Sequence, residues 1–222
     1  MTPQILIQCA KDKNQSPFYD NGNRVCFVAT PDQYPNNNDV IVNPNDEINN
    51  ENWIERIRAY NDTNGNPSKL LPAIHLYKDP IYKEIGEAVG INNTFILSAG
   101  WGLVSGSFLL PNYDITFSKA PNVPEYTKRD PNTLYDWDDI NAFDDISISY
   151  DDLHVFCVPS YYPLLNKMLE NKKINNIILH VRNSNVPNDG ELNFQHISRN
   201  YKTKRKINWH YACARDFINK LR

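Results

Sequence analysis

The sequence contains no long hydrophobic run and no closely spaced pair of cysteines, and each absence excludes a class of protein. No apolar stretch among its 222 residues approaches the roughly 20 residues that a membrane-spanning helix requires. Residues 1–13 have no basic region and only a short apolar stretch, so we expect no secretory signal. The four cysteines are far apart and form no Cys-x-x-Cys motif, which argues against a zinc ribbon and against a disulfide framework. We therefore expect a cytoplasmic protein with no membrane partner, no obligate protein partner, no metal and no cofactor.

Hydrophobic residues, in contrast, are present in concentrated runs and make up 41% of the chain. A chain of this length can bury roughly 70% of its extended-chain surface, which is enough for a core without metals or disulfides. Five apolar runs have the length and composition of strands, and helical patterns lie between them. We therefore predict a single α/β domain over residues 1–222, with a mostly parallel central sheet flanked by helices. The predicted strands are Gln4–Cys9, Arg24–Ala29, Thr94–Ala99, Leu153–Val158 and Asn176–Val181.

Three helices are predicted between and after these strands. Asp79 and Pro80 are typical of a helix start, because aspartate caps the first turn and proline fits its first position. A second helical pattern begins at Ser160, and a C-terminal helix carries an apolar stripe from Trp209 to Leu221.

The net charge of −3 conceals two segments of opposite charge. Residues 125–152 include nine acidic and two basic residues, whereas residues 196–222 include eight basic and one acidic residue. We interpret 30–52 and 121–152 as insertions or lids, and 196–222 as a basic tail with the C-terminal helix. The tail interleaves cations with aromatic rings, as nucleic-acid surfaces do, although a solvated charged face gives the same pattern. Its candidate phosphate-binding residues are Lys202, Lys204, Arg205 and Lys206.

Polar residues follow or end three of the predicted strands. Open α/β sheets bind their ligands beyond the carboxyl ends of the strands, so these residues are the first candidates for a site. They are Cys9, Lys11 and Lys13 after the first strand, then Ser98, Gly100, Trp101, Gly102, Tyr113 and Asp114 after the third, and His180 in the fifth.

The order of motifs in residues 4–117 resembles that of the YaaA-like family and its small relatives. An apolar strand is followed by C-x-K-x-K, L-Y, I-L-S-A-x-x-G-L-V and P-x-Y-D-x-T-F, at residues 9–13, 76–77, 96–104 and 111–117. The chain departs from many relatives at Gly100-Trp101, where they carry Lys or Leu, and in the long segment between the first two motifs. The resemblance implies an α/β fold related to the uracil-DNA glycosylases, with DNA binding and base processing. That group includes phage-defence DNA glycosylases of the Brig type.

The residues of the predicted site suit the excision of a base. Cleavage of an N-glycosidic bond passes through a cationic sugar, which a nearby carboxylate stabilises. Asp114 can supply this carboxylate while Tyr113 stacks on a flipped base, or Asp114 can merely cap a turn. Lys11 and Lys13 can bind phosphate or a base carbonyl, or they can be solvated surface lysines. His180 resembles the histidine that stabilises the leaving base in uracil-DNA glycosylases, although the sequence around it lacks the His-Pro-Ser context.

The turn after the third strand has two interpretations. Ser98, Gly100 and Gly102 can form a turn whose backbone N–H groups bind an anion, or an ordinary tight turn. Trp101 lies between two glycines, which favours a projecting ring that stacks on DNA or wedges it open. Cys9 is either a small buried residue at a strand end or a nucleophile.

We therefore expect a DNA glycosylase that excises a modified base, acts in anti-phage defence and has DNA as its partner. Two other functions fit the same residues. One is a non-catalytic DNA-binding or stress-response protein of the YaaA type, and the other is a domain that binds or cleaves free nucleotides.

Overall fold

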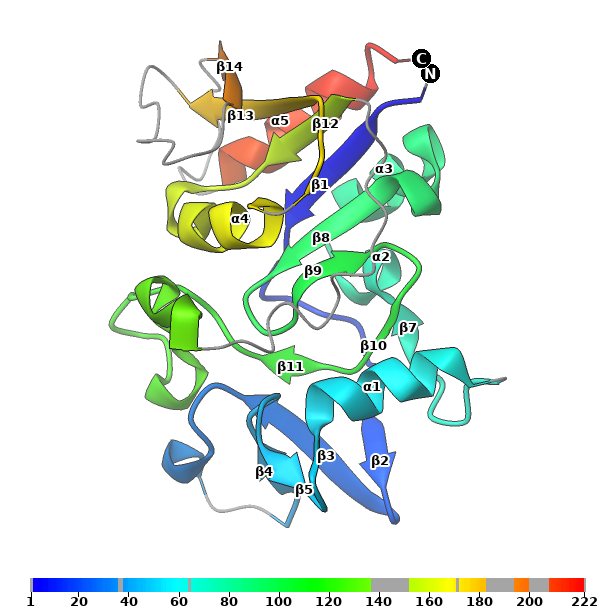
Figure 1. Ribbon diagram of the computed structural model, residues 1–222, viewed down its shortest axis with the longest axis vertical. Helices are drawn as coiled ribbons and strands as arrows, with labels where there is room; N and C mark the ends of the chain where they lie inside the picture. The colour runs from blue at the N-terminus through cyan, green and yellow to red at the C-terminus, as the bar shows by residue number, and fades with distance from the viewer. Residues whose placement is uncertain are drawn as a thin grey trace.

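The computed structural model describes residues 2–35, 38–63, 65–136, 152–170, 172–182, 194–199 and 208–221. Its centre is a six-stranded sheet with the order β14-β13-β12-β1-β8-β9 (Figure 1). The first five of these strands are parallel, and β9 pairs with β8 in the antiparallel direction. The mixed α/β class with a mostly parallel central sheet is thereby confirmed. The strands are β1 (Gln4–Gln8), β8 (Thr94–Ser98), β9 (Gly102–Ser105), β12 (Asp152–Phe156), β13 (Asn176–Arg182) and β14 (Phe194–Arg199).

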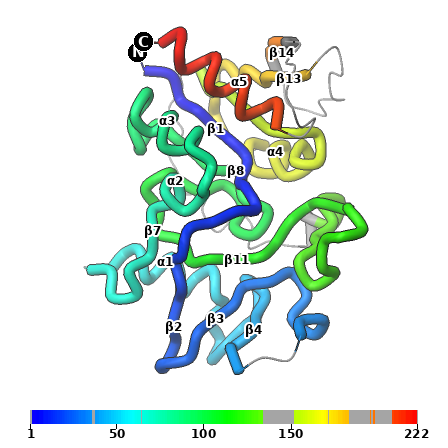
Figure 2. The backbone as a smooth tube through the Cα atoms, turned by 180° about the vertical axis from the view of Figure 1, so that it is seen from behind, coloured from blue at the N-terminus to red at the C-terminus, as the bar shows by residue number. Residues whose placement is uncertain are grey.

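Helices cover both faces of this sheet. Figure 2 shows α3 (Pro80–Val89) and α5 (Trp209–Ile218) together on one face, whereas α4 (Tyr162–Leu169) lies on the other in Figure 1. All three lie where the sequence predicts helices. The predicted start of α3 is confirmed, because the Asp79 side chain accepts a hydrogen bond from the Ile81 backbone at 3.0 Å. A bidentate pair joins α5 to α3, with Arg215 nitrogens 2.7 and 3.0 Å from the Glu84 carboxylate oxygens.

A smaller sheet lies at the other end of the molecule (Figure 1). Its central strand is the second predicted apolar run, which therefore lies outside the main sheet. The segment interpreted as the insertion 30–52 contributes one strand to this sheet, so part of it is integral to the fold. The strands are β2 (Phe18–Asp20), β3 (Asn23–Val28), β4 (Val40–Val42) and β11 (Tyr113–Asp114).

Helix α1 (Trp53–Asp62) covers the smaller sheet and was not predicted from the sequence. A capping box starts it, because Asn52 and Glu55 each accept the other's backbone N–H. The Trp53 ring is buried against Phe27, at 5.7 Å between ring centroids. The remaining elements are short: β5 (Glu47–Ile48), β6 (Glu51–Asn52), β7 (Leu71–Pro72), α2 (Ala73–Leu76), β10 (Leu109–Leu110), and the 3-10 helices Pro31–Gln33, Ile91–Asn93, Glu125–Thr127, Pro131–Asp136 and Pro159–Tyr161.

Several sequence predictions fall wholly or partly outside the described residues. Residues 137–151 of the acidic segment lie outside them, as do the four candidate cations of the basic tail, Lys202, Lys204, Arg205 and Lys206. Of the remaining tail, residues 196–199 belong to β14 at the edge of the sheet and 209–218 form α5. Among the helices of the described chain, none has the length and apolar character needed to cross a bilayer.

Trp101 joins the cores of the two sheets. Its side chain is only 1% exposed, and its ring centroid lies 5.0 Å from that of Phe27 in β3. The prediction of a projecting wedge is therefore wrong. The flanking glycines have other roles: Gly100 makes room for the Tyr113 ring, and Gly102 adopts a positive φ of 71°.

Replacing Trp101 with alanine should destabilise the protein, because it removes one of the largest buried side chains and leaves a cavity between the sheets. We expect the free energy of unfolding to fall by about 3–5 kcal/mol in urea titrations. Tyr19→Ala is the control, because the Tyr19 ring is 51% exposed. Equal stability of the two variants would contradict a core role for Trp101.

Candidate functional site

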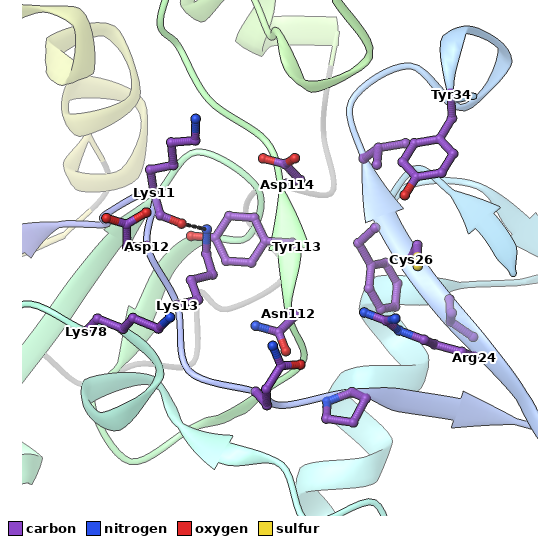
Figure 3. A pocket seen from close by; sticks show the side chains of 15 residues that line it. Lys11, Asp12, Lys13, Arg24, Cys26, Tyr34, Lys78, Asn112, Tyr113 and Asp114 are labelled. Atoms are coloured by element: carbon purple, nitrogen blue, oxygen red, sulfur yellow. Dashed lines mark hydrogen bonds between the residues drawn. The ribbon is translucent and has the colours of Figure 1, made fainter. Parts of the chain in front are cut away.

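A cleft lies between β3 of the smaller sheet and the segment that follows β1, with β11 along its wall (Figure 3). Its volume is about 390 Å³, which is in the usual range for small-molecule sites. Two hydrogen bonds hold its walls: the Lys78 backbone N–H donates to the Asp12 carbonyl at 3.0 Å, and the Asn112 side-chain amide donates to the Asn14 carbonyl at 2.7 Å. The cleft thus brings together the first predicted polar cluster and the Tyr113-Asp114 pair.

Cations outnumber carboxylates in the cleft. None of its four cations forms a salt bridge to any residue that the structure describes. The exposed Asp114 carboxylate likewise has neither a hydrogen bond nor a salt bridge within the described ranges. An anion that enters the cleft therefore meets positive charge that the protein has not neutralised. The charged residues are Lys11, Lys13, Arg24, Lys78, Asp12 and Asp114.

Tyr113 is fixed from two sides at the cleft wall. Its hydroxyl receives a hydrogen bond from the Ser98 hydroxyl at 2.9 Å and lies 2.9 Å from the Tyr77 hydroxyl. Burial raises the pKa of Tyr113 well above its usual value, so the phenol stays protonated. A Cβ atom on Gly100 would lie 2.8 Å from the ring, which explains why glycine occupies that position. A base can stack on the ring face beneath Lys13 only by displacing that side chain.

The turn after β8 does not offer free amides to an anion. The Ser98 hydroxyl oxygen accepts hydrogen bonds from the backbone N–H groups of Gly100 at 3.2 Å and Trp101 at 3.1 Å. The interpretation as an anion-binding turn is therefore wrong for these two groups, and the ordinary tight turn is confirmed. Arg129 reinforces the turn by donating to the Ala99 carbonyl at 2.8 Å. Burial lowers the pKa of Arg129 to about 8.

Lys11 and Lys13 lie in different environments, although both line the cleft. Lys11 is exposed, whereas Lys13 is half-buried with its Nζ 4.0 Å from the Tyr113 ring centroid and 5.9 Å from that of Tyr77. The Lys13 Nζ also donates to the Lys11 carbonyl at 3.3 Å. Burial lowers the pKa of Lys13 because it penalises the charged ammonium. The two lysines are therefore chemically distinct.

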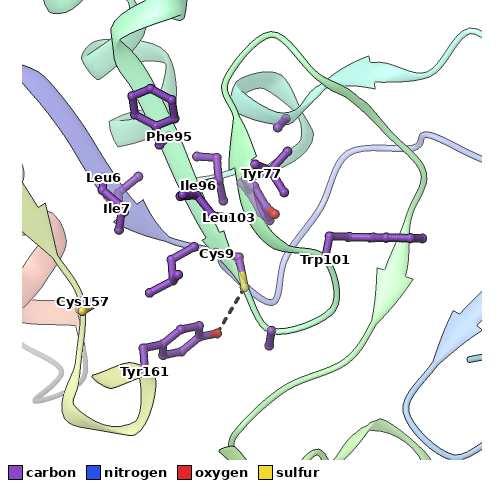
Figure 4. Packing of buried hydrophobic residues seen from close by; sticks show 14 of the residues in the cluster. Leu6, Ile7, Cys9, Tyr77, Phe95, Ile96, Trp101, Leu103, Cys157 and Tyr161 are labelled. Carbon is purple, nitrogen blue, oxygen red and sulfur yellow. Dashed lines mark hydrogen bonds between the residues drawn. The ribbon is translucent and has the colours of Figure 1, made fainter. Parts of the chain in front are cut away.

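Cys9 lies behind the cleft rather than in its lining. Its side chain is buried among apolar groups, and its Sγ is 3.2 Å from the Tyr161 hydroxyl (Figure 4). The interpretation of Cys9 as a small buried residue at the end of β1 agrees with this position.

His180 is not part of the cleft. It lies inside β13, two positions before the strand ends, and is buried against Phe156 at 4.2 Å between ring centroids. Its Nε2 is 3.1 Å from His154 Nδ1, and the Phe217 ring of α5 lies 5.6 Å away. The prediction that His180 and Asp114 share one catalytic site is therefore wrong. The His180 side chain packs beside α5 on one face of the sheet and does not reach the carboxyl edge.

The cleft also contains residues that sequence reasoning missed. Arg24 was included in a predicted strand, where alternation with the buried Val25 would have placed it on an exposed face. Lys78 directly follows the Leu-Tyr motif, which was the available signal. Tyr34 gives no signal in the sequence; its ring packs against Tyr126 at 4.7 Å between centroids.

No family model matches the chain, and no curated protein or solved structure is found to be similar to it. Among the residues of the described ranges, no group of histidine, cysteine or carboxylate side chains is arranged to hold a metal ion. The function must therefore follow from the chemistry of the cleft.

Replacing Ser98 with alanine should loosen the wall of the cleft. The variant loses the acceptor for two backbone N–H groups and the donor to Tyr113, so we expect a loss of about 1–3 kcal/mol in unfolding free energy. Denaturant titration measures this loss. Ser105→Ala is the matched control, because within the described ranges the Ser105 side chain bonds only the exposed Ser107 hydroxyl. A Ser98→Ala protein as stable as the control would contradict the structural role of this hydroxyl.

Proposed function

We propose that the protein is a DNA glycosylase that excises a base by hydrolysis of its N-glycosidic bond. The observation that carries this proposal is the Asp114 carboxylate, exposed on a cleft whose four cations have no salt-bridge partner in the described chain. These cations attract the phosphates of DNA, whose affinity for proteins is dominated by such contacts. A carboxylate among phosphate-binding cations suits a reaction in which positive charge develops on a sugar beside a phosphate.

Asp114 has the chemistry that this reaction needs. As the bond from C1′ to the base breaks, the sugar ring acquires cationic character, and a fixed carboxylate lowers the energy of that state. The base leaves with the bonding electrons, water attacks C1′, and the proton that the water loses ends on the departed base. The volume of about 390 Å³ suits a single nucleotide, so a base in a duplex has to leave the stack to enter.

The resemblance of residues 4–117 to the YaaA-like family supports the same proposal. On that basis we assign the fold to the group related to uracil-DNA glycosylases. The Brig-type members of the group make modified phage DNA the first substrate to test.

A second candidate function is the hydrolysis of a free nucleotide. The size of the cleft favours this alternative, because a mononucleotide carries the phosphate, sugar and base in one small molecule. Release of base from free nucleotides but not from DNA would select it. Binding of DNA without release of any base would select the non-catalytic alternative.

The Asp114→Asn variant tests the catalytic assignment. We expect base excision to fall about a hundredfold while DNA affinity stays near that of the wild type, because the amide keeps the shape but not the charge. Excision is measured as alkali-induced strand breaks at abasic sites, on canonical and on glycosylated phage DNA. Asp62→Asn, at an exposed position of α1, is the control. Full activity of Asp114→Asn would end this assignment.

Loss of Arg24 or Lys78 should weaken DNA binding rather than catalysis. The plot of log affinity against log salt has a negative slope, and each Gln variant should make it less steep by about 0.7–0.9 per lost phosphate contact. Fluorescence anisotropy of labelled oligonucleotides over a salt series measures the slope. Lys83→Gln is the control, because Lys83 is an exposed lysine of α3 that pairs with Glu87. Slopes identical to that of the control would remove both residues from the DNA-binding surface.

A further inference from the structure

Lys13 differs from the other lysines of the cleft in how its amine is held. The Nζ lies over the face of Tyr113 and forms no salt bridge to a carboxylate among the described residues; within that part of the chain it donates its hydrogen bond to the neutral Lys11 carbonyl. A lysine ammonium is strongly hydrated on a flexible stem, and burial readily shifts its pKa, so a half-buried amine differs chemically from a solvated one. The amine instead has a fixed location on the wall of the cleft.

This location is beside the carboxylate that we assign to catalysis. Tyr113 and Asp114 are consecutive residues of β11, and Lys13 covers the ring of the first (Figure 3). Both side chains line the same cleft, and the Asp114 charge acts on the Lys13 amine, so a sugar whose C1′ reacts next to Asp114 shares the cleft with that amine. Lysine is a nucleophile only when its amine is uncharged, and a desolvated position favours the uncharged form.

The charged groups around Lys13 act in both directions. Burial lowers its pKa most, and the neighbouring Lys11 lowers it further, whereas Cys9, Asp114 and Asp12 raise it. The net direction is downward. A larger fraction of Lys13 is therefore a free amine at neutral pH than of a solvated lysine.

We propose that Lys13 is a nucleophile that forms an imine with the abasic sugar, so that the protein also cleaves DNA at abasic sites. This inference rests on the proposed function, because it requires the cleft to admit a nucleotide of DNA. It assigns to Lys13 a covalent role instead of the phosphate contact predicted from the sequence.

The chemistry is balanced without any further reactant. The Lys13 Nζ attacks C1′ of the ring-opened abasic sugar, an aldehyde, and loss of one water gives the imine. Solvent water takes a proton from C2′, the electrons of that bond move toward the imine, and the C3′–O bond breaks with the 3′ phosphate as the leaving group. Hydrolysis of the imine returns the amine and releases the cleaved strand.

The experiment uses an oligonucleotide with one preformed abasic site and sodium cyanoborohydride, which reduces the imine to a stable amine. The full-length protein should form a covalent complex on a denaturing gel, and Lys13→Arg should lower its yield at least about tenfold while keeping the positive charge. Lys83→Arg should trap like the wild type. No complex with the wild type, or an equal yield with Lys13→Arg, would overturn the proposal.

Peptide mapping of the wild-type complex makes the result independent of how the variant folds. The adduct should lie on Lys13, and an adduct on Lys11, Lys78 or any other lysine would overturn the proposal. Because the preformed abasic site bypasses base excision, the two proposals fail separately. Trapping on Lys13 without base release from intact DNA would contradict only the glycosylase, and base release without trapping would contradict only the nucleophile.

Discussion

The hydroxyl of Tyr113 receives a hydrogen bond from Ser98 and shares another with Tyr77, and the shape of the cleft depends on these contacts. Ser98 ends β8 of the central sheet, Tyr77 follows α2, and Tyr113 belongs to β11 of the smaller sheet. One phenol therefore connects the two sheets at the point where the cleft opens. Because Asp114 is the next residue, the same contact fixes the start of the strand segment that carries the carboxylate. The contact with Gly100 removes the remaining freedom of the ring.

Burial of the Tyr77 and Tyr113 phenols also determines the charge of the cleft wall. Tyr77 and Tyr113 both have pKa values raised by burial, so neither phenol is a counter-ion at neutral pH. Their ring faces stabilise a cation to a modest degree, about 0.5–2 kcal/mol for such contacts. That is weaker than a buried ion pair would be, and the Lys13 amine consequently remains easier to deprotonate than a solvated lysine. The same packing that makes the wall rigid thus gives two neighbouring lysines different chemistry.

The sequence was sufficient to predict four strands of the central sheet, β1, β8, β12 and β13, but not its two edge strands, β9 and β14, nor the smaller sheet. The four predicted strands are apolar runs because helices cover both faces of the sheet, and that pattern is visible without a structure. In the smaller sheet, β4 and β11 are only three and two residues long, and both pair with β3, from which residues 29–39 separate β4 and residues 29–112 separate β11.

The prediction for Trp101 was wrong because its position also depends on a residue far away in the sequence. Flanking glycines are compatible with exposure, but they equally allow a large ring to be enclosed, and only the position of Phe27 decides between the two.

The candidate site was predictable to the extent that it lies at strand ends. Lys13 follows β1 of the central sheet, whereas Asp114, 101 positions away, ends β11 of the smaller sheet, a strand that the sequence did not predict; both were nevertheless selected among the polar residues that follow predicted strands. The strand-end rule fails for Arg24, whose side chain reaches the cleft from the smaller sheet, and for His180, whose strand continues beyond it.

The cations that line the cleft also explain how a chain of net charge −3 can attract an anion. Even with the Lys13 amine uncharged, Lys11, Arg24 and Lys78 outnumber the two carboxylates of the cleft, so the local potential that a bound phosphate experiences is positive although the net charge of the chain is negative.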